Sequence, residues 1–472
     1  MKSKIIKATI ISVLLALQLQ SCDESDNTVP NIQGSFQWNW ANLLYGPSNE
    51  DEVDAVASDA QGNVYLSGKF EDSLFIEGQT DPISSNGSAD IMIVKYDKSG
   101  VLQWIKHFGG IGEDNIFDAV CDEEGNVYLS GFFENTVQFG NITLMAQGEW
   151  DMVVLKLNSN GNVLWAKQYG GKGRDGGNEV EFGNNHQLIV AAQSEGTFEG
   201  IANTGNQDAY VLSLSSQDGS VNWIKSVQGP GYARAKAIAV DHQGNAYLGG
   251  DYLNSTFINS NEGTNTFDIY GGTDAYLASW TSEGTFRWVK TWGGIGNDLC
   301  KGVTVNSKNE LYMVAPFENT VDIDGMEFTS AGASDLIVMK SDNSGKINWL
   351  RQISGIENLY GAELAVDRED DLVFGMSVWG MVSFESGNAD SKKIIVGAER
   401  SPILVSYDLN GNFSQYLMGT VNQGDAHFGE ISISNNTAYL DCEIIEGPHI
   451  FGTATFVSQN NSKDAVIVSI GL

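Results

Sequence analysis

The sequence predicts an all-β fold made of repeated four-stranded antiparallel units, and three observations support that prediction. A Gly-x-x-x-Trp segment recurs about every 60 residues, as in SGVLQW from Ser99 and NGNVLW from Asn160. Each repeat contains four short runs rich in β-branched and aromatic residues, bounded by Gly, Asn or Asp. No segment after residue 22 has the periodicity of an amphipathic helix. Four short strands repeated about seven times are typical of a β-propeller, whose radial arrangement protects the sheet edges.

The two ends of the repeat region predict how it closes. The last repeat contains only three strands and ends at DAVIVSIGL, whereas GSFQWNWANLLYG near the N-terminus supplies one strand that aligns with a fourth strand. Three strands and one strand complete a seventh blade. We therefore expect a seven-bladed β-propeller over residues 34–472, with Trp38 in the same sheet as the strand 464–470. This pairing would leave no exposed sheet edge.

Regular turn signals separate the expected strands. Asp-x-x-Gly-Asn joins the first strand to the second at 59–63, 122–126 and 241–245, and a glycine turn joins the third to the fourth. Asp accepts local backbone hydrogen bonds while Gly or Asn adopts positive φ, so these segments are expected to form tight turns. An aspartate also opens the third strand in six repeats, where we expect a structural hydrogen bond between neighbouring loops: Asp90, Asp151, Asp208, Asp274, Asp335 and Asp464.

The repeated tryptophan is expected to lie at the seam between one blade and the next. Burial of a ring of this size contributes several kcal/mol, about 3 to 5 by the cost of truncating it to Ala. The series assigned to this structural role is Trp38, Trp104, Trp165, Trp223, Trp288 and Trp349.

The composite pattern resembles a known repeat family. The segments W-x-K-x-x-G-G-x-G-x-D, D-x-x-G-N-x-Y-L-x-G, D-x-x-x-x-K and G-x-x-x-W follow one another in the best repeats. They resemble the bacterial β-propeller repeat often abbreviated SBBP, and the resemblance covers the chain from about residue 34 to residue 472. The family is defined by its fold more than by an activity, so the resemblance implies little chemistry.

The N-terminus has the features of a secretion signal. A short basic stretch and an apolar run at residues 8–19, too short to span a bilayer, precede LQSC. LQSC resembles the lipobox of bacterial lipoproteins, and the following DESD resembles the acidic export signal of surface lipoproteins in the Bacteroidota. The resemblance implies a signal peptide at residues 1–21, lipidation of Cys22, an acidic tether at residues 22–33 and a protein anchored by lipid in the outer membrane, exposed at the cell surface. A secreted protein with an incidental cysteine is the alternative.

The charge of the chain restricts its partners. Lys and Arg number 26 and Asp and Glu number 60, which gives a formal net charge of −34 at pH 7. Binding to a polyphosphate requires the opposite sign, so nucleic acid is not an expected partner. We interpret the charge as keeping an extracytoplasmic protein soluble, with cation binding as the alternative.

No catalytic constellation is recognisable in the sequence. The histidines lack metal-ligand spacing such as His-x-x-x-His, and no Ser or Cys lies in a nucleophile elbow. We therefore expect a non-catalytic binding module for a glycan or a protein. A glycosidase or lyase with unidentified carboxylates is the enzymatic alternative. The Gly-x-x-x-Trp strand also resembles the tryptophan-docking motif of quinoprotein dehydrogenases and of a lipoprotein that assists outer-membrane protein assembly, which implies an assembly scaffold as a further alternative.

Three glycine-rich segments, GGIGED, GGKGRD and GGIGND, resemble calcium-binding nonapeptides. Those nonapeptides occur in tandem, whereas these segments occur once per repeat, so we interpret them as crossings from one blade to the next. The alternative is a ring of carboxylates near the axis that holds Ca²⁺: Asp114, Asp175, Asp298 and Asp425.

Strand direction predicts two different faces. The tight turns share one face, while the glycine-rich crossings and the long second-to-third loops, such as 251–273 and 376–400, share the other. The N-terminal strand begins on the tight-turn face, so we expect the opposite face to be the recognition surface. Aromatic residues expected there are the candidate ligand contacts: Trp150, Tyr270 and Trp379.

Overall fold

The computed structural model describes residues 36–48, 51–184, 186–260, 263–387, 391–397, 399–458 and 463–472. The chain divides into two compact units, Met1–Gln33 and Gly34–Leu472, and every described residue belongs to the second unit. The expected signal peptide, Cys22 and the expected tether at 22–33 lie outside the described residues. Every regular element of the described part is a strand, which confirms the all-β prediction. It follows that this part of the chain has no helix that could cross a bilayer.

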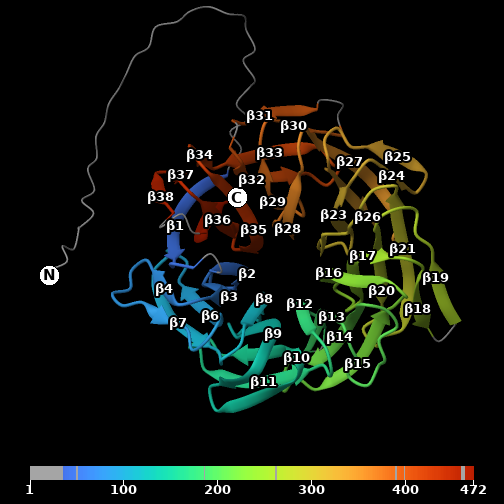
Figure 1. Ribbon diagram of the computed structural model, residues 1–472. Helices are drawn as coiled ribbons and strands as arrows, with labels where there is room; N and C mark the ends of the chain where they lie inside the picture. Colours follow the sequence, from blue (N-terminus) through green and yellow to red (C-terminus); the bar gives the residue numbers. More distant parts are fainter. Residues whose placement is uncertain are drawn as a thin grey trace, which may run out of the picture. The chain divides into compact units, whose positions relative to one another are not determined.

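Seven sheets contain at least four antiparallel strands each, and most follow the chain as simple meanders (Figure 1). The first is β2 (Glu52–Ser58), β3 (Val64–Phe70), β6 (Asp90–Tyr96) and β7 (Leu102–Phe108). The second is β8 (Asp114–Cys121), β9 (Val127–Phe139), β10 (Ile142–Leu157) and β11 (Val163–Tyr169). The third is β12 (Asp175–Phe182), β13 (Gln187–Ser194), β14 (Asp208–Ser215) and β15 (Val221–Val227). The fourth begins with β16 (Tyr232–Val240), β17 (Ala246–Leu253), β20 (Asp274–Trp280) and β21 (Phe286–Gly294).

The remaining three sheets complete this series. The fifth begins with β22 (Gly302–Val305), β23 (Leu311–Phe317), β26 (Asp335–Ser341) and β27 (Ile347–Gly355). The sixth is β28 (Tyr360–Val366), β29 (Leu372–Val378), β32 (Ser401–Tyr407) and β33 (Phe413–Met418). The seventh begins with β35 (Asp425–Ser434), β36 (Thr437–Ile445), β39 (Lys463–Gly471) and β1 (Gln37–Tyr45). The four-stranded antiparallel unit predicted from the repeat is therefore observed.

The seventh sheet joins the two ends of the described chain. Strand β1 pairs antiparallel with β39, with Trp38 opposite Ile470 and Gln37 opposite Gly471. The expected pairing of the N-terminal strand with the last strand is thus present. Because Gln37 lies opposite the end of β39, the chain enters this sheet at the same end as the turn around Asn436, whose backbone carbonyl accepts a hydrogen bond from the Leu472 amide.

The first strands of successive sheets lie side by side along the chain. Strand β8 contacts both β2 and β12, β16 contacts both β12 and β22, and β28 contacts both β22 and β35. Strand β35 in turn contacts β2, and the hydroxyls of Ser58 and Ser432 are 2.7 Å apart. The sheets therefore follow one another in the manner of a β-propeller, with their first strands innermost (Figure 1).

Short outer hairpins occupy most of the second-to-third connections, which the sequence analysis treated as loops. They are β4 (Ser73–Ile76) with β5 (Ile83–Ser84), β18 (Thr256–Ser260) with β19 (Gly263–Phe267), β24 (Thr320–Ile323) with β25 (Met326–Thr329), β30 (Met381–Phe384) with β31 (Lys392–Ile395), and β37 (Pro448–Phe451) with β38 (Ala454–Val457). Strands β4, β24 and β30 pair with β1, β21 and β27, the outer strands of the preceding sheets, and β37 pairs with β34 (Thr420–Val421). These hairpins cover edge strands and link neighbouring sheets.

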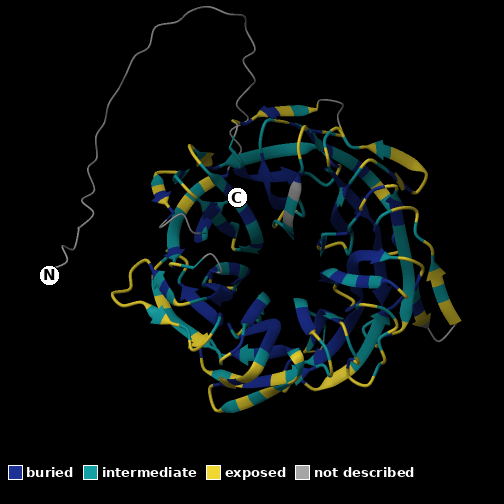
Figure 2. Ribbon diagram, in the orientation of Figure 1, coloured by how far each residue is buried: buried dark blue, intermediate teal, exposed yellow. Residues whose placement is uncertain are grey.

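The core lies between neighbouring sheets. Each apolar cluster combines residues of two consecutive sheets, as with Tyr65 of β3 and Leu129 of β9, or Tyr312 of β23 and Phe374 of β29. Strands β3, β6, β20 and β29 are buried at every residue. Their sequences are almost continuously apolar because both faces of each strand are covered. Exposed residues concentrate on the outer strands and hairpins (Figure 2).

The same hydrogen bond recurs at six of the seams between consecutive sheets. The indole Nε1 of a tryptophan in the fourth strand donates to a backbone carbonyl in the third-to-fourth turn of the next sheet. The pairs are Trp40 to Lys98 (3.0 Å), Trp104 to Ser159 (3.0 Å), Trp165 to Ser216 (3.3 Å), Trp223 to Ser282 (2.9 Å), Trp288 to Asn343 (3.2 Å) and Trp349 to Leu409 (3.1 Å). The glycine of the same turn lies against the indole ring, as Gly100 does on Trp40 and Gly411 on Trp349. A side chain at these glycines would meet the ring, which explains the repeated pairing of Gly with Trp.

The N-terminal strand has a different register from the one that the spacing predicts. A β-bulge lies between Trp38 and Trp40, and Trp40 opposes Ser469 as Trp104 opposes Lys95 in the first sheet. Trp40 therefore takes the seam position that the sequence analysis assigned to Trp38. Trp38 packs edge-on against Phe451 of the outer hairpin, with ring centroids 5.5 Å apart.

Candidate functional site: the central channel

The first strands share an irregularity that directs side chains toward the axis. A β-bulge interrupts the pairing of β2, β8, β12, β16, β28 and β35 with their second strands, always in the half of the strand nearer the crossing from the preceding sheet. A bulge leaves one residue unpaired and re-aims its side chain. The same irregularity in six strands therefore places polar side chains at one level of the channel, which we call the crossing-loop end.

All seven first strands line a cavity of about 310 Å³ along this channel. A second cavity of about 310 Å³ lies at the level of the bulges, and its polar lining includes Asp54, Asn178, Glu179, Lys236, Lys301 and Glu430. Glu363 contributes to both cavities and Asp118 to the first. Charged residues from six different sheets are thus gathered at one end of the channel.

An ion pair crosses from the fifth sheet to the sixth at the centre of this group. Nζ of Lys301 lies 2.7 Å from a carboxylate oxygen of Glu363. The proximity of Glu363 is the main cause that raises the pKa of Lys301, with Glu430 and Glu179 acting in the same direction. Lys301 therefore stays protonated and faces three carboxylates from different sheets.

The neighbouring carboxylates are held in a poorly solvated environment. Burial raises the pKa of Glu179 and of Glu430 well above the ordinary range, and the charge of Glu363 raises both further. Burial likewise raises the pKa of Asp118, although two backbone amides that donate to it act against the shift. Such shifts are typical of functional sites, where several like charges share one cavity.

Backbone amides fix two of these carboxylates across sheet boundaries. Asp118 of the second sheet accepts a hydrogen bond from the amide of Val180 at 2.7 Å, and Glu179 of the third sheet accepts one from the amide of Ile238 at 2.6 Å. The carboxylate positions therefore depend on the seams between the sheets. On the fourth sheet, burial and the nearby Arg234 lower the pKa of the Lys236 ammonium.

The four carboxylates proposed from the glycine-rich crossings lie in a different setting. Oδ2 of Asp114, Asp175 and Asp298 accepts the amide hydrogen of Gly110, Gly171 and Gly294, respectively, at 2.8 to 2.9 Å. Asp425 accepts the amide hydrogen of Arg400 at 3.2 Å. Each carboxylate therefore binds nearby backbone, which supports the interpretation of these segments as crossings.

A fifth member of this set was not identified from the sequence. Asp51 opens the first sheet as Asp114 opens the second, and it accepts the amide hydrogen of Glu71 at 3.0 Å just as Asp114 accepts that of Glu134 at 3.0 Å. Burial raises the pKa of both carboxyls to about 7. The segment YGPSNED before β2 lacks the Gly-Gly signal, so the repeat pattern did not reveal Asp51. Across the described ranges, no group of three or more His, Cys, Asp and Glu side chains has an arrangement that would hold a metal ion.

The three candidate aromatic contacts are dispersed. Trp150 lies in β10, beneath the Arg174 guanidinium at 4.7 Å and beside the Phe132 ring. Tyr270 is 69% exposed, just before β20. Trp379 follows β29 and stacks with the Arg400 guanidinium at 4.3 Å. Since Arg400 also donates to Asp425, the structure brings Trp379 and Asp425 together and leaves the other two aromatic residues in separate sheets.

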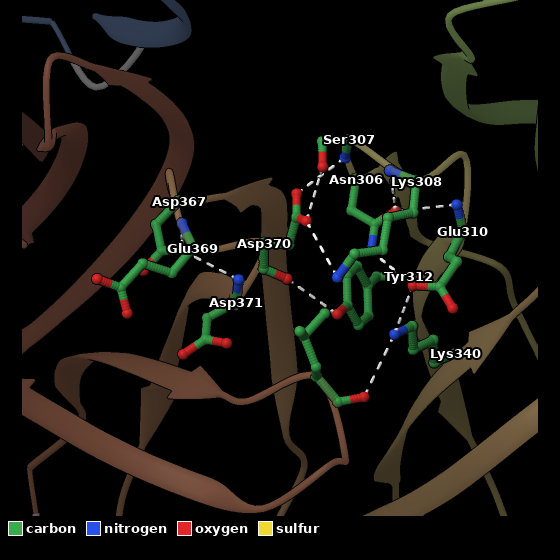
Figure 3. Close-up of polar contacts among 11 residues, drawn as sticks. Asn306, Ser307, Lys308, Glu310, Tyr312, Lys340, Asp367, Glu369, Asp370 and Asp371 are labelled. Carbon is green, nitrogen blue, oxygen red and sulfur yellow. Dashed lines mark hydrogen bonds and ion pairs between the residues drawn. The ribbon is translucent and has the colours of Figure 1, made fainter.

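The tight-turn end of the seam between the fifth and sixth sheets carries a separate polar network (Figure 3). The amide and hydroxyl of Ser307 donate to the Asp370 carboxylate at 2.9 and 2.7 Å, and the Tyr312 hydroxyl donates to the Asp370 carbonyl at 3.0 Å. Lys340 lies 2.7 Å from Glu310. These contacts join two consecutive turns, so we interpret this network as structural.

The channel residues were not identified from the sequence, although the pattern of the first strands gives a weak indication of them. A charged residue interrupts an otherwise apolar first strand in FDAV, NEVEF, GAELAV and FGEISI. Such a residue in a buried strand indicates either a local hydrogen bond or a lined cavity. Only the arrangement of the sheets shows that the residues from separate repeats share one channel.

The fold and the charged channel define a repeat protein of the β-propeller type. No protein-family model matches the chain. It is 23% identical over 331 residues to the regulatory protein FlaEY of Caulobacter vibrioides, covering 64% of this chain and 33% of that protein. It is 22% identical over 449 residues to the uncharacterized WD repeat-containing protein L264 of Acanthamoeba polyphaga mimivirus, covering 78% of this chain and 32% of that protein. The chain spans about a third of the length of these relatives.

Solved structures with a similar arrangement of sheets include a WD40 β-propeller domain and a lyase. The WD40 β-propeller domain of Doa1 is 11% identical, with a TM-score of 0.44 and coverage of 92% of this chain and 97% of that domain. The virginiamycin B lyase of Staphylococcus aureus is 10% identical, with a TM-score of 0.43 and coverage of 93% and 99%. Neither similarity carries a function to this chain.

Proposed function

We propose that residues 34–472 form a closed seven-bladed β-propeller that acts as a non-catalytic binding module for a glycan or a protein. Closure is supported by the pairing of β1 with β39 and by the contact of β35 with β2. The recurring Trp-to-turn hydrogen bond supports equivalence of the sheets and is compatible with the SBBP-type repeat that the sequence resembles.

The observation that carries the binding proposal is the charged cavity at the crossing-loop end. Asp54, Glu179, Lys236, Lys301 and Glu430 come from five sheets and converge on one space of about 310 Å³. Binding sites for small groups are concave and present a few convergent polar side chains.

The N-terminal features support a surface location. We propose that Cys22 is lipidated and anchors the chain in the outer membrane, with residues 22–33 as a tether. Gln37 lies at the tight-turn end of β1, opposite the crossing-loop end, and we propose the crossing-loop end as the recognition surface.

Binding is tested with purified protein comprising residues 23–472, on glycan arrays and in pull-down experiments. We expect a ligand whose binding is lost when Glu430 is replaced by Gln. The matched control is Glu123→Gln, because Glu123 is exposed in the tight turn 122–126. Ligand binding that persists in Glu430→Gln and disappears in Glu123→Gln would contradict the proposed site.

The channel carboxylates also favour one second candidate, an enzyme that uses general acid and base catalysis. Raised carboxyl pKa values, such as that of Glu179, keep a proton available near neutral pH. This candidate predicts that the bound glycan is cleaved and that its product is released by the same preparation. Recovery of intact ligand after prolonged incubation would favour the binding module.

A further inference from the structure

We propose that the crossing-loop end of the channel docks a basic polypeptide segment, with a lysine or arginine side chain entering the channel. This inference rests on the proposed binding function and names the ligand class of the same site. The ligand class is inferred from the charge of the channel residues and from the exposed apolar residues of the crossings.

The first step of the argument is the imbalance of charge in the channel. Two ammonium groups, Lys236 and Lys301, face five carboxyl groups: Asp54, Asp118, Glu179, Glu363 and Glu430. Lys301 is already paired with Glu363. The remaining carboxyl groups are poorly solvated, since burial raises the pKa of Asp54 to about 6 and raises those of Asp118, Glu179 and Glu430 well above their ordinary range. An entering cation would favour the ionised form of these carboxyl groups, because opposite charges attract.

The second step is preorganisation. Val180 and Ile238 hold Asp118 and Glu179 through backbone amides, and the Asn115 amide holds Asp54 at 2.9 Å. These side chains are fixed before a ligand arrives, so binding does not require their ordering. A rigid ring of acceptors suits an ammonium or guanidinium group, which carries several N–H donors.

The third step is the apolar surface beside the opening. Three isoleucines occupy equivalent tips of the glycine-rich crossings, and they are highly exposed: Ile111 (78%), Ile295 (75%) and Ile356 (58%). Ile111 and Ile295 precede the aspartates Asp114 and Asp298 by three residues, which places them within about 10 Å of those aspartates. An exposed apolar side chain at one repeated position is typical of a protein-binding surface.

The fourth step concerns the approach of the partner. The formal net charge of −34 attracts a cationic segment over long distances and disfavours an acidic one. A basic segment with apolar flanks therefore matches the channel, the exposed isoleucines and the overall charge at once.

The test uses the protein from residue 23 to residue 472 and a short fluorescent peptide in which arginine alternates with leucine. A matched peptide has glutamate in place of arginine. We expect the arginine peptide to bind, measured by anisotropy, and the glutamate peptide to show no binding. Glu179→Gln and Glu430→Gln should each weaken binding by about tenfold, because each removes a carboxylate that faces the cation. Both variants are expected to fold, since their raised pKa values show that a neutral side chain is tolerated.

The controls separate local from long-range effects. Glu123→Gln and Glu124→Gln remove one charge each from an exposed tight turn and should change affinity less than about twofold. Equal losses in the channel and control variants would overturn the inference, because binding would then depend on overall charge only. Ligand binding that Ile295→Ser abolishes but the channel Gln variants leave unchanged would overturn the inference while retaining the proposed recognition surface. If none of these substitutions affected a demonstrated ligand, both proposals would fail.

Discussion

The Trp104 indole and the Ser159 carbonyl are joined by a hydrogen bond of 3.0 Å across the seam between the first and second sheets. The Lys95 ammonium donates to the same carbonyl at 2.9 Å. The pattern repeats with Trp165 and Lys156 on Ser216, and with Trp349 and Lys340 on Leu409. The tryptophan of the Gly-x-x-x-Trp strand and the lysine of the Asp-x-x-x-x-Lys strand thus act together on the next sheet. Their recurrence in the sequence reflects a joint that six seams share, and a lysine takes part in three of them.

Replacement of a seam tryptophan is expected to destabilise the protein strongly. Trp165 is only 7% exposed, so Trp165→Ala should lower the free energy of unfolding by about 3 to 5 kcal/mol. Trp165→Phe keeps an aromatic ring and removes the donor to Ser216, so it should cost less, about 1 to 3 kcal/mol. Denaturant unfolding measures both values. A loss below 1 kcal/mol for Trp165→Ala, by the same scale, would contradict the structural role.

The turn at Asp367–Asp371 departs from the repeat pattern, and a substitution that restores the pattern should stabilise the protein. In the turns 59–63, 122–126 and 241–245 an Asn amide donates to the Asp, as Asn126 does to Asp122 at 2.7 Å. Asp371 replaces that Asn and places a second carboxylate beside Asp367. Asp371→Asn should raise the free energy of unfolding at pH 7 by about 1 kcal/mol, because it removes repulsion and restores a hydrogen bond. The reverse change, Asn245→Asp, should destabilise the equivalent turn by a similar amount.

The same position predicts a pH dependence. Burial, followed by the charges of Asp367, Asp408 and Glu369, raises the pKa of Asp371 to about 6 from 3.8. A raised carboxyl pKa in the folded state stabilises the protein below the unfolded pKa, and this contribution is lost as pH rises through about 6. The advantage of Asp371→Asn should therefore grow between pH 4 and pH 6, as read from those two pKa values. Thermal melts of both proteins across this range measure it; a constant difference would refute the shift.

A structural role of the crossing carboxylates can be distinguished experimentally from a role in calcium binding. Asp298 is fully buried and accepts the Gly294 amide hydrogen at 2.8 Å. Asp298→Ala should lower the free energy of unfolding by about 1 to 3 kcal/mol, because it leaves a loop amide without its acceptor. We expect the same loss in calcium and in chelator. A melting temperature of the unsubstituted protein that rises with calcium, and no longer does so in Asp298→Ala, would instead establish a calcium site.

Lipidation of Cys22 is tested in cells that process lipoproteins. The full chain should partition into the detergent phase and into the membrane fraction, because the bacterial modification attaches more than one acyl chain and such anchors are stable. Cys22→Ser should move the protein to the aqueous phase. Unchanged partitioning of that variant would show that the membrane association has another cause.

The hydrogen bonds and turn conformations that involve neighbouring residues could be predicted from the sequence for most of the fold. Asp59 accepts amide hydrogens from Gln61 and Asn63 at 3.0 and 2.9 Å, and Gly62 between them has a φ of 82°, as the Asp-x-x-Gly-Asn pattern predicts. Asp208, one of the aspartates that open third strands, binds the Thr204 amide of its own loop at 2.9 Å, whereas a hydrogen bond between neighbouring loops was expected there. These features involve residues within a few positions of one another, so a short stretch of sequence contains both partners.

Contacts between residues that are far apart in the chain could be identified only from the folded structure. The bulge that places Trp40 rather than Trp38 at the seam depends on how β1 pairs with a strand more than four hundred residues away. Lys301 directly precedes β22, and Glu363 interrupts the apolar strand β28; nothing in either repeat indicates the other. They meet because the first strands of successive sheets converge on one axis, where burial in a shared cavity couples charges that are distant in the chain.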